Sequence, residues 1–154
     1  ELTQVLDSAV RLAWNELRHR ARVVREYSDL PLVRGSEARL GQVFLNLLIN
    51  AADAMSEVPR DGHARIRVST RVSGGEIGVS IADTGHGMTP EVMARAFEES
   101  FTTKPVGQGR GIGLYLCKTL IEQSGGRIEL ASVAGEGTTV SLLLPIVAPP
   151  RTEA

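Results

Sequence analysis

The sequence predicts an α+β fold, a two-layer sandwich in which a mixed, mostly antiparallel sheet carries three main helices on one face. Apolar residues recur at helical spacing in three segments of the chain. Two pairs of alternating segments meet at glycine-rich turns, one at Gly74-Gly75 and one at Gly135 to Gly137, as β-hairpins do. Because helical and alternating segments are interleaved along the chain, we expect them to share one core.

The first third of the chain predicts two helices with a strand between them. Apolar residues at helical spacing fill residues 2–17, and residues 22–27 resemble a short strand. Ser36 is a suitable N-cap for a second helix over residues 39–55. The segment 57–62, which contains proline and glycine, is expected to form a loop.

The middle of the chain predicts a hairpin followed by a long irregular segment. Residues 64–72 and 76–82 alternate as two strands do. Residues 84–111 are rich in glycine, threonine and proline, apart from a brief helical stretch over residues 90–97. A segment of that length without an apolar stripe is more often functional than structural.

The last third predicts a helix and a second hairpin. The helix covers residues 112–123 and is ended by two glycines. The strands cover residues 127–133 and 138–144. Residues 146–154 are expected to form a tail, which leaves one domain over residues 1–154 with a core over about residues 2–145.

Composition excludes several function classes. The chain has 154 residues, of which 42% are hydrophobic and 23% charged, as in a globular protein. Its 17 basic and 18 acidic residues give a net charge of −1, which does not favour nucleic acid or direct membrane contact. Cys117 is the single cysteine, so no disulfide forms within the chain and a cytoplasmic location is expected. The chain opens within a helical pattern and without Met, so we expect a longer parent protein, membrane-bound or not.

A polar stripe on the second helix is the first sign of a binding site. On a helical wheel Gln42, Asn46, Asn50 and Asp53 fall together, beside a broad apolar face. Polar groups on a buried helix need partners, and loop backbone or water could supply them. Amide oxygens also suit Mg²⁺, which shares oxygen ligands with nucleotide phosphates. The glycine loops elsewhere favour the second interpretation, with Asn50 as the metal ligand and Asn46 beside it.

Four further strings complete a pattern that resembles the catalytic and ATP-binding domains of sensor histidine kinases. These domains belong to the gyrase, Hsp90, histidine kinase and MutL (GHKL) superfamily. The second helix resembles the N box of the family, and the other strings resemble its first glycine box, F box, second glycine box and last glycine motif. In order, the five are QVFLNLLINAADAM, DTGHGM, FEESFTTK, GQGRGIGL and GEGT. The resemblance covers about residues 35–145.

The resemblance implies a Bergerat-type ATP-binding fold with ATP and Mg²⁺ as ligands and a mobile lid over about residues 88–111. It implies transfer of the γ-phosphoryl group to a histidine on a separate dimerisation and phosphoacceptor domain. That domain is expected in the parent protein. The resemblance also implies that the parent is a homodimer and that a response regulator receives the phosphoryl group from it. His19 and His63 lack the sequence context of such a phosphoacceptor.

On the adenine side, the resemblance implies that Asp83 accepts a hydrogen bond from the exocyclic amine. A buried acceptor would discriminate against guanine, which carries a carbonyl there. Alternatively, Asp83 only caps the following turn. Met88 either lines the pocket or packs in the core. The same resemblance includes further nucleotide contacts, namely Asp53, Gly85, Gly87, Thr103 and Thr138.

On the phosphate side, a glycine loop runs directly into a helix, and backbone amides in that arrangement bind anions. The residues concerned are Gly109, Arg110, Gly111, Ile112, Gly113 and Leu114. Arg110 either pairs with a phosphate or faces solvent. Lys104 is either a phosphate contact or a solvated loop residue. The residues expected to act in catalysis are Asn46, Asn50 and Lys104.

Asn46 favours a kinase over a hydrolase. The ATP-hydrolysing members of the superfamily carry a glutamate at this position, which activates water, and an amide is not basic enough to do so. The alternatives are a GHKL ATPase and a serine-phosphorylating kinase of the same fold. A nucleotide sensor without activity is a third interpretation, which the intact motifs disfavour.

Overall fold

A computed structural model of the chain describes residues 2–31, 33, 36–55, 64–98 and 113–146. These residues form four helices and five strands, each close to a predicted segment. In chain order they are α1 (Leu2–Leu17), β1 (Arg22–Glu26), α2 (Glu37–Ala54), β2 (Arg65–Ser73), β3 (Glu76–Asp83), α3 (Pro90–Arg95), α4 (Leu114–Gln123), β4 (Arg127–Val133) and β5 (Gly137–Pro145).

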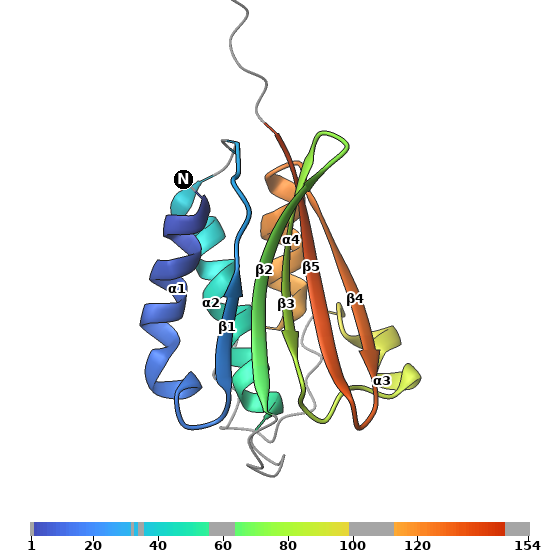
Figure 1. Cartoon of the computed structure of the whole chain (residues 1–154). Coiled ribbons are helices and arrows are strands. Elements are labelled where there is room, and N and C mark those ends of the chain that lie inside the picture. The colour runs from blue at the N-terminus through green and yellow to red at the C-terminus, as the bar shows by residue number, and fades with distance from the viewer. Residues whose placement is uncertain (1, 32, 34–35, 56–63, 99–112, 147–154) are drawn as a thin grey trace, which may run out of the picture.

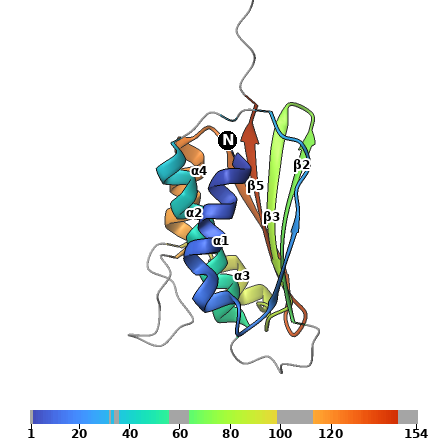
Figure 2. The ribbon, with the colours of Figure 1, turned by 60° about the vertical axis from the view of Figure 1, so that its left-hand side comes forward.

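The five strands form one mixed sheet in the order β1-β2-β3-β5-β4. Only the β1–β2 pair is parallel among the described strands, and the other three pairs are antiparallel. The helices all cover the same face of this sheet, as the two views show (Figures 1 and 2). The predicted two-layer α+β fold is therefore confirmed.

The core lies between the sheet and α2, which contacts both α1 and α4. Phe44 and Leu48 of α2 are fully buried there, together with the alternating apolar residues of the strands. This explains why α2 is apolar around most of its circumference. Its polar stripe is consequently held in place by a rigid, well-packed helix. No helix among the described residues has both the length and the apolarity to cross a membrane.

The ends of the two site-forming helices differ slightly from the sequence prediction. α2 begins at Glu37, two residues earlier than predicted, because the Ser36 side chain accepts a hydrogen bond from the Arg39 backbone N–H at 3.3 Å. α4 begins at Leu114, and its last turn is closed by backbone N–H groups of the two glycines that follow it.

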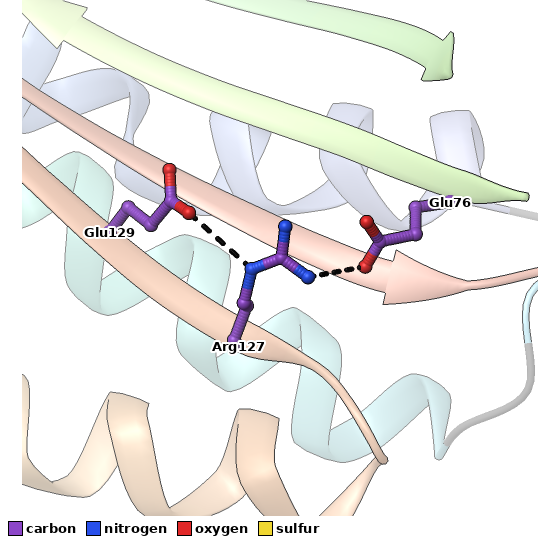
Figure 3. A network of polar contacts seen from close by, with 3 residues as sticks. All are labelled: Glu76, Arg127 and Glu129. Carbon is purple, nitrogen blue, oxygen red and sulfur yellow. Dashed lines mark hydrogen bonds and ion pairs between the residues drawn. The ribbon is translucent and has the colours of Figure 1, made fainter. Parts of the chain in front are cut away.

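The other face of the sheet carries small polar residues and ion pairs. The guanidinium of Arg127 lies between two carboxylates, donating to Glu76 at 2.8 Å and to Glu129 at 3.4 Å (Figure 3). The Ser80 and Ser141 hydroxyls lie 3.1 Å apart on adjacent strands. Among the described residues, the buried Asn46 Nδ2, which has no hydrogen-bond partner, lies instead in α2 on the covered face.

Candidate nucleotide-binding site

Asn46 is a buried amide without a full set of partners. Its side chain lies on the polar stripe of α2 and is 6% exposed. Its Nδ2 makes no hydrogen bond within the part of the chain that the structure describes. The amide adjoins the Cys117 thiol of α4, which is only a weak hydrogen-bonding group. Burial raises the pKa of that thiol to about 11, and the Asn46 contact opposes the rise. A buried donor left in this state is expensive unless a ligand or water satisfies it.

The two other predicted stripe residues near the C-terminal end of α2 are partly buried. Asn50 lies one turn beyond Asn46. Asp53 lies a further turn along, and its Oδ1 accepts a hydrogen bond from Arg20 Nη1 at 3.2 Å. The structure therefore gives Asp53 a partner from the segment after α1, so its role as a nucleotide contact stays a prediction. Asn46 and Asn50 lie on the same polar stripe of α2.

Asp83 ends β3 on the sheet face that the helices cover. Its Oδ1 accepts a hydrogen bond from the Gly85 backbone N–H at 2.8 Å, which fits the predicted turn cap. Burial raises the pKa of Asp83 above its ordinary value, and backbone hydrogen bonds from Gly85 and Thr138 oppose the rise. The carboxylate is thus held in a poorly solvated place by few donors. It can serve the turn and still offer lone pairs to an amine.

The raised pKa of Asp83 gives a pH-dependent prediction. A raised folded-state pKa means that the wild type gains stability when Asp83 is protonated, so this contribution is lost as pH rises through that pKa. We expect the wild type to gain stability relative to Asp83→Asn as pH falls from 7 toward 4. Thermal unfolding of both proteins across that range measures the gap, and parallel pH profiles would contradict the assignment.

The turn after Asp83 is packed tightly against two other elements. The His86 backbone N–H donates to Ala54 O at the end of α2 at 3.1 Å, and the Gly135 N–H donates to His86 O at 2.7 Å. A Cβ on Gly85 would lie 2.6 Å from Ala54 O, and a Cβ on Gly87 would lie 2.1 Å from Val133 O. Glycine is required at both positions by close approach of backbone, which fixes the turn beside the polar stripe.

Met88 is held by a side chain that the predicted site did not include. Its backbone N–H donates to Ser132 Oγ at 2.8 Å. Ser132 in turn donates to Gly137 O at 2.9 Å, and its oxygen lies 2.8 Å from Thr138 Oγ1. Asp83, Thr138 and Ser132 occupy adjacent positions across β3, β5 and β4. Ser132 is linked to the site only by this strand register, which the sequence alone does not give.

The start of the predicted lid is anchored to the core. Thr89 caps α3 by accepting a hydrogen bond from the Val92 backbone N–H at 3.3 Å. The partly buried Phe97 packs against the core, and Lys118 Nζ of α4 lies 5.6 Å from its ring centroid. The predicted contacts at Thr103, Lys104, Gly109, Arg110, Gly111 and Ile112 lie outside the described residues.

The N-terminal end of α4 completes the described site. Gly113 is its N-cap and offers no side-chain cap to the first backbone amides, of which the Leu116 N–H donates to Gly113 O at 3.1 Å. α4 packs on α2, and the Cys117–Asn46 contact brings the first turns of α4 beside the polar stripe. The described groups thus combine helix-end amides, neutral side-chain amides and a partly buried carboxylate, a set that suits an anionic ligand with an amine-bearing ring.

Residues 35–148 match the family of histidine kinase-, DNA gyrase B- and HSP90-like ATPases. The chain belongs to this family. Membership in the ATPase family confirms the predicted resemblance and the ATP-binding character of the domain. Among the described residues there is no group of three His, Cys, Asp or Glu side chains that could hold a metal.

The chain is similar in sequence to sensor kinases, among them a sensor histidine kinase. The chain is 37% identical over 117 residues to sensor histidine kinase ZraS of Escherichia coli K12, a match that covers 76% of this chain and 24% of ZraS. It is 35% identical over 127 residues to sensor kinase CckA of Brucella abortus, covering 76% of this chain and 13% of CckA. The chain thus spans about a quarter or less of these relatives.

Solved structures agree with the sequence relatives. The catalytic domain of histidine kinase ThkA superimposes with a TM-score of 0.78 at 25% identity, covering 93% of this chain and 91% of that domain. The mycobacterial sensor histidine kinase MprB gives a TM-score of 0.75 at 26% identity, with 93% of each chain covered. The ATPase family therefore shares both the sequence pattern and the sheet-and-helix arrangement of this chain.

Proposed function

We propose that this chain is the catalytic domain of a sensor histidine kinase, which binds Mg²⁺·ATP and transfers its γ-phosphoryl group to a histidine of a separate domain. The observation that carries the proposal is that the buried Asn46 Nδ2 has no hydrogen-bond partner among the described residues, while Ala54 at the end of the same helix contacts the turn after the partly buried Asp83 carboxylate. Asn46 supplies a donor for an anion, and Asp83 an acceptor for the adenine amine. Family membership supports the same ligand.

The described residues fit a magnesium-bound nucleotide. Asn46 Nδ2 is a buried donor that lacks an acceptor within the described chain, and a phosphate oxygen would provide one. Asn50 would hold Mg²⁺ through its amide oxygen, because this metal prefers oxygen ligands and keeps phosphates among them. When bound, Mg²⁺ would neutralise charge on the phosphates. Arg110 and Lys104 complete the proposed phosphate contacts, and Thr103 belongs to the same proposed lid.

Positioning accounts for most of the chemistry that these residues can perform. The buried α2 would position Asn46 and Asn50 against the phosphates, and the turn from Asp83 to Met88 would position the adenine. The domain thus aligns the γ-phosphoryl group for transfer and supplies no nucleophile of its own. Asn46 cannot deprotonate water, because neither atom of its amide is basic near neutral pH. A better nucleophile, such as an imidazole, is therefore needed from outside the described site.

The acceptor is proposed to come from another domain of the parent protein. His19 is exposed at the end of α1, and its Nε2 accepts a hydrogen bond from Arg18 Nε at 3.1 Å. His86 lies in the turn, where its Nδ1 lies 2.8 Å from Gly87 O. We therefore propose a histidine-bearing dimerisation domain, a homodimeric parent and a response regulator that takes the phosphoryl group. We also propose a cytoplasmic location, because ATP is available there and the free Cys117 thiol suits a reducing compartment.

The experiment incubates the chain with Mg²⁺ and γ-labelled ATP, alone and together with the histidine-bearing dimerisation domain of the parent protein. We expect negligible label on the chain alone, and acid-labile label on the added domain. Phosphoramidate linkages hydrolyse in acid, whereas phosphoserine survives it, so acid treatment separates the two kinases. Rapid phosphate release by the chain alone would instead indicate a GHKL ATPase, and acid-stable label a serine kinase. Either result would overturn the proposal.

A further inference from the structure

A transverse row of polar side chains crosses the helix-covered face of the sheet. The strand register aligns Asp83 of β3 with Thr138 of β5, and Thr138 with Ser132 of β4. The next row on the same face is apolar, with Ile81, Val140 and Leu130. Polar groups that are shielded from water require hydrogen-bond partners, so the partners of these three side chains have to be identified.

The hydroxyl of Ser132 joins both glycine-containing segments of the site. It accepts the Met88 backbone N–H at 2.8 Å from the segment after β3. It donates to Gly137 O at 2.9 Å in the segment that opens β5. Separately, the Gly135 N–H donates to His86 O at 2.7 Å, which holds the same two segments together through backbone. Ser132 therefore connects the two segments through its side chain.

The contacts of Ser132 also decide which way the Thr138 hydroxyl points. A serine hydroxyl has one proton and two lone pairs. The carbonyl of Gly137 can only accept, so the Ser132 proton belongs to that bond. The contact of 2.8 Å between Ser132 Oγ and Thr138 Oγ1 is then made with the Thr138 proton. Proton positions follow here from the partners that each atom has.

Thr138 is consequently left with lone pairs only. Its side chain is 7% exposed, and its backbone N–H donates to the neighbouring Asp83. An acceptor-only hydroxyl beside a carboxylate matches an amine with two hydrogens, such as the exocyclic amine of adenine. It does not match a ring that presents a carbonyl oxygen at this place, because two acceptors would then face each other.

We infer that Ser132 is a positioning residue that sets adenine specificity, because its contacts commit the Thr138 proton and leave the Thr138 hydroxyl as an acceptor. This inference rests on the proposed nucleotide site and names a residue that acts on it through Thr138. Ser132 itself is not placed against the nucleotide. Its effect should therefore depend on the exocyclic amine of the base rather than on the phosphates.

The test measures binding to the full chain of Mg²⁺·ATP and of purine riboside triphosphate, which lacks the exocyclic amine. We expect Ser132→Ala to lower the affinity for Mg²⁺·ATP about fivefold to tenfold, the effect of one lost buried hydrogen bond. The affinity for the amine-free nucleotide should stay within about twofold of the wild-type value. Ser132→Thr keeps the hydroxyl and should restore ATP affinity. Thermal unfolding of each variant shows that it is folded.

Two comparisons separate positioning from general stability. Ser141→Ala is the matched control, because Ser141 is also a strand serine with a hydroxyl contact, but on the opposite face of the sheet. It should change neither affinity. In a Thr138→Val background, Ser132→Ala should change ATP affinity by less than about twofold, since the residue through which it acts has been removed.

Several results would overturn the inference. One is an equal loss for both nucleotides in Ser132→Ala, and another is an undiminished loss in the Thr138→Val background. Unchanged ATP affinity in Ser132→Ala would also reject it, while the proposed function would stand. Absence of ATP binding by the wild type would instead reject the proposed function itself, so the two failures are distinguishable.

Discussion

Asn50→Ala is expected to remove the magnesium dependence of ATP binding. The proposed site has a single protein ligand for the metal, so its loss leaves the phosphates without a bridge to α2. We expect Mg²⁺·ATP to bind about 10- to 100-fold more weakly, the range for lost contacts to charged groups. Affinity for ATP measured in excess chelator should be nearly unchanged. Calorimetric titration with and without Mg²⁺ measures both values.

Gln42→Ala is the matched control for this experiment. Gln42 begins the same polar stripe two turns earlier and is exposed, so the same truncation is made on the same helix. It should leave both affinities at the wild-type values. If Asn50→Ala retains full magnesium dependence, the metal-ligand assignment is wrong even if ATP still binds.

Gly87→Ala is expected to destabilise the domain strongly. Gly87 has a φ of 70°, which side-chain-bearing residues adopt at a cost of about 1–2 kcal/mol. A Cβ there would also lie 2.1 Å from Val133 O, so the turn must move away from β4. We expect a total loss above about 3 kcal/mol and a fall in unfolding temperature of roughly 10 °C. Adenine nucleotides should bind much more weakly, because Met88 follows directly.

Gly135→Ala separates the backbone cost from the close approach. Gly135 has a similar φ of 83°, in the neighbouring turn, but a Cβ there would meet nothing within 4 Å. It should lower the unfolding temperature by only about 2–4 °C, as expected for about 1 kcal/mol. Equal losses in the two variants, measured by calorimetry, would show that the packing of Gly87 against Val133 is unimportant.

The parts of the fold that follow from local pattern were predictable from sequence. The apolar spacing of α1 and α2, the alternation of the strands and the two hairpin turns each fix an element with its neighbours. The polar stripe also followed from a helical wheel, since Asn46 and Asn50 lie a turn apart on one helix. These signals need only the residues of a single element.

The remaining features depend on contacts between distant segments. The pairing of Arg20 with Asp53 requires that the end of α1 meet the end of α2, which no local pattern states. Ser132 is one serine among several in the strands, and only its register with Thr138 distinguishes it. The sequence likewise does not state that α4 places Cys117 beside Asn46, or that the Asn46 Nδ2 has no hydrogen-bond partner among the described residues.

The central claim is that Mg²⁺·ATP binds between the Asn-bearing face of α2 and the segment from Asp83 to Met88. The most direct measurement is calorimetric titration of the chain with a non-hydrolysable ATP analogue in excess Mg²⁺, compared with the corresponding guanine nucleotide. The proposed site predicts saturable one-to-one binding of the adenine nucleotide that Asp83→Ala abolishes, and much weaker binding of the guanine nucleotide. Absence of binding heat over a range of temperatures, or equal affinity for both bases, would contradict it.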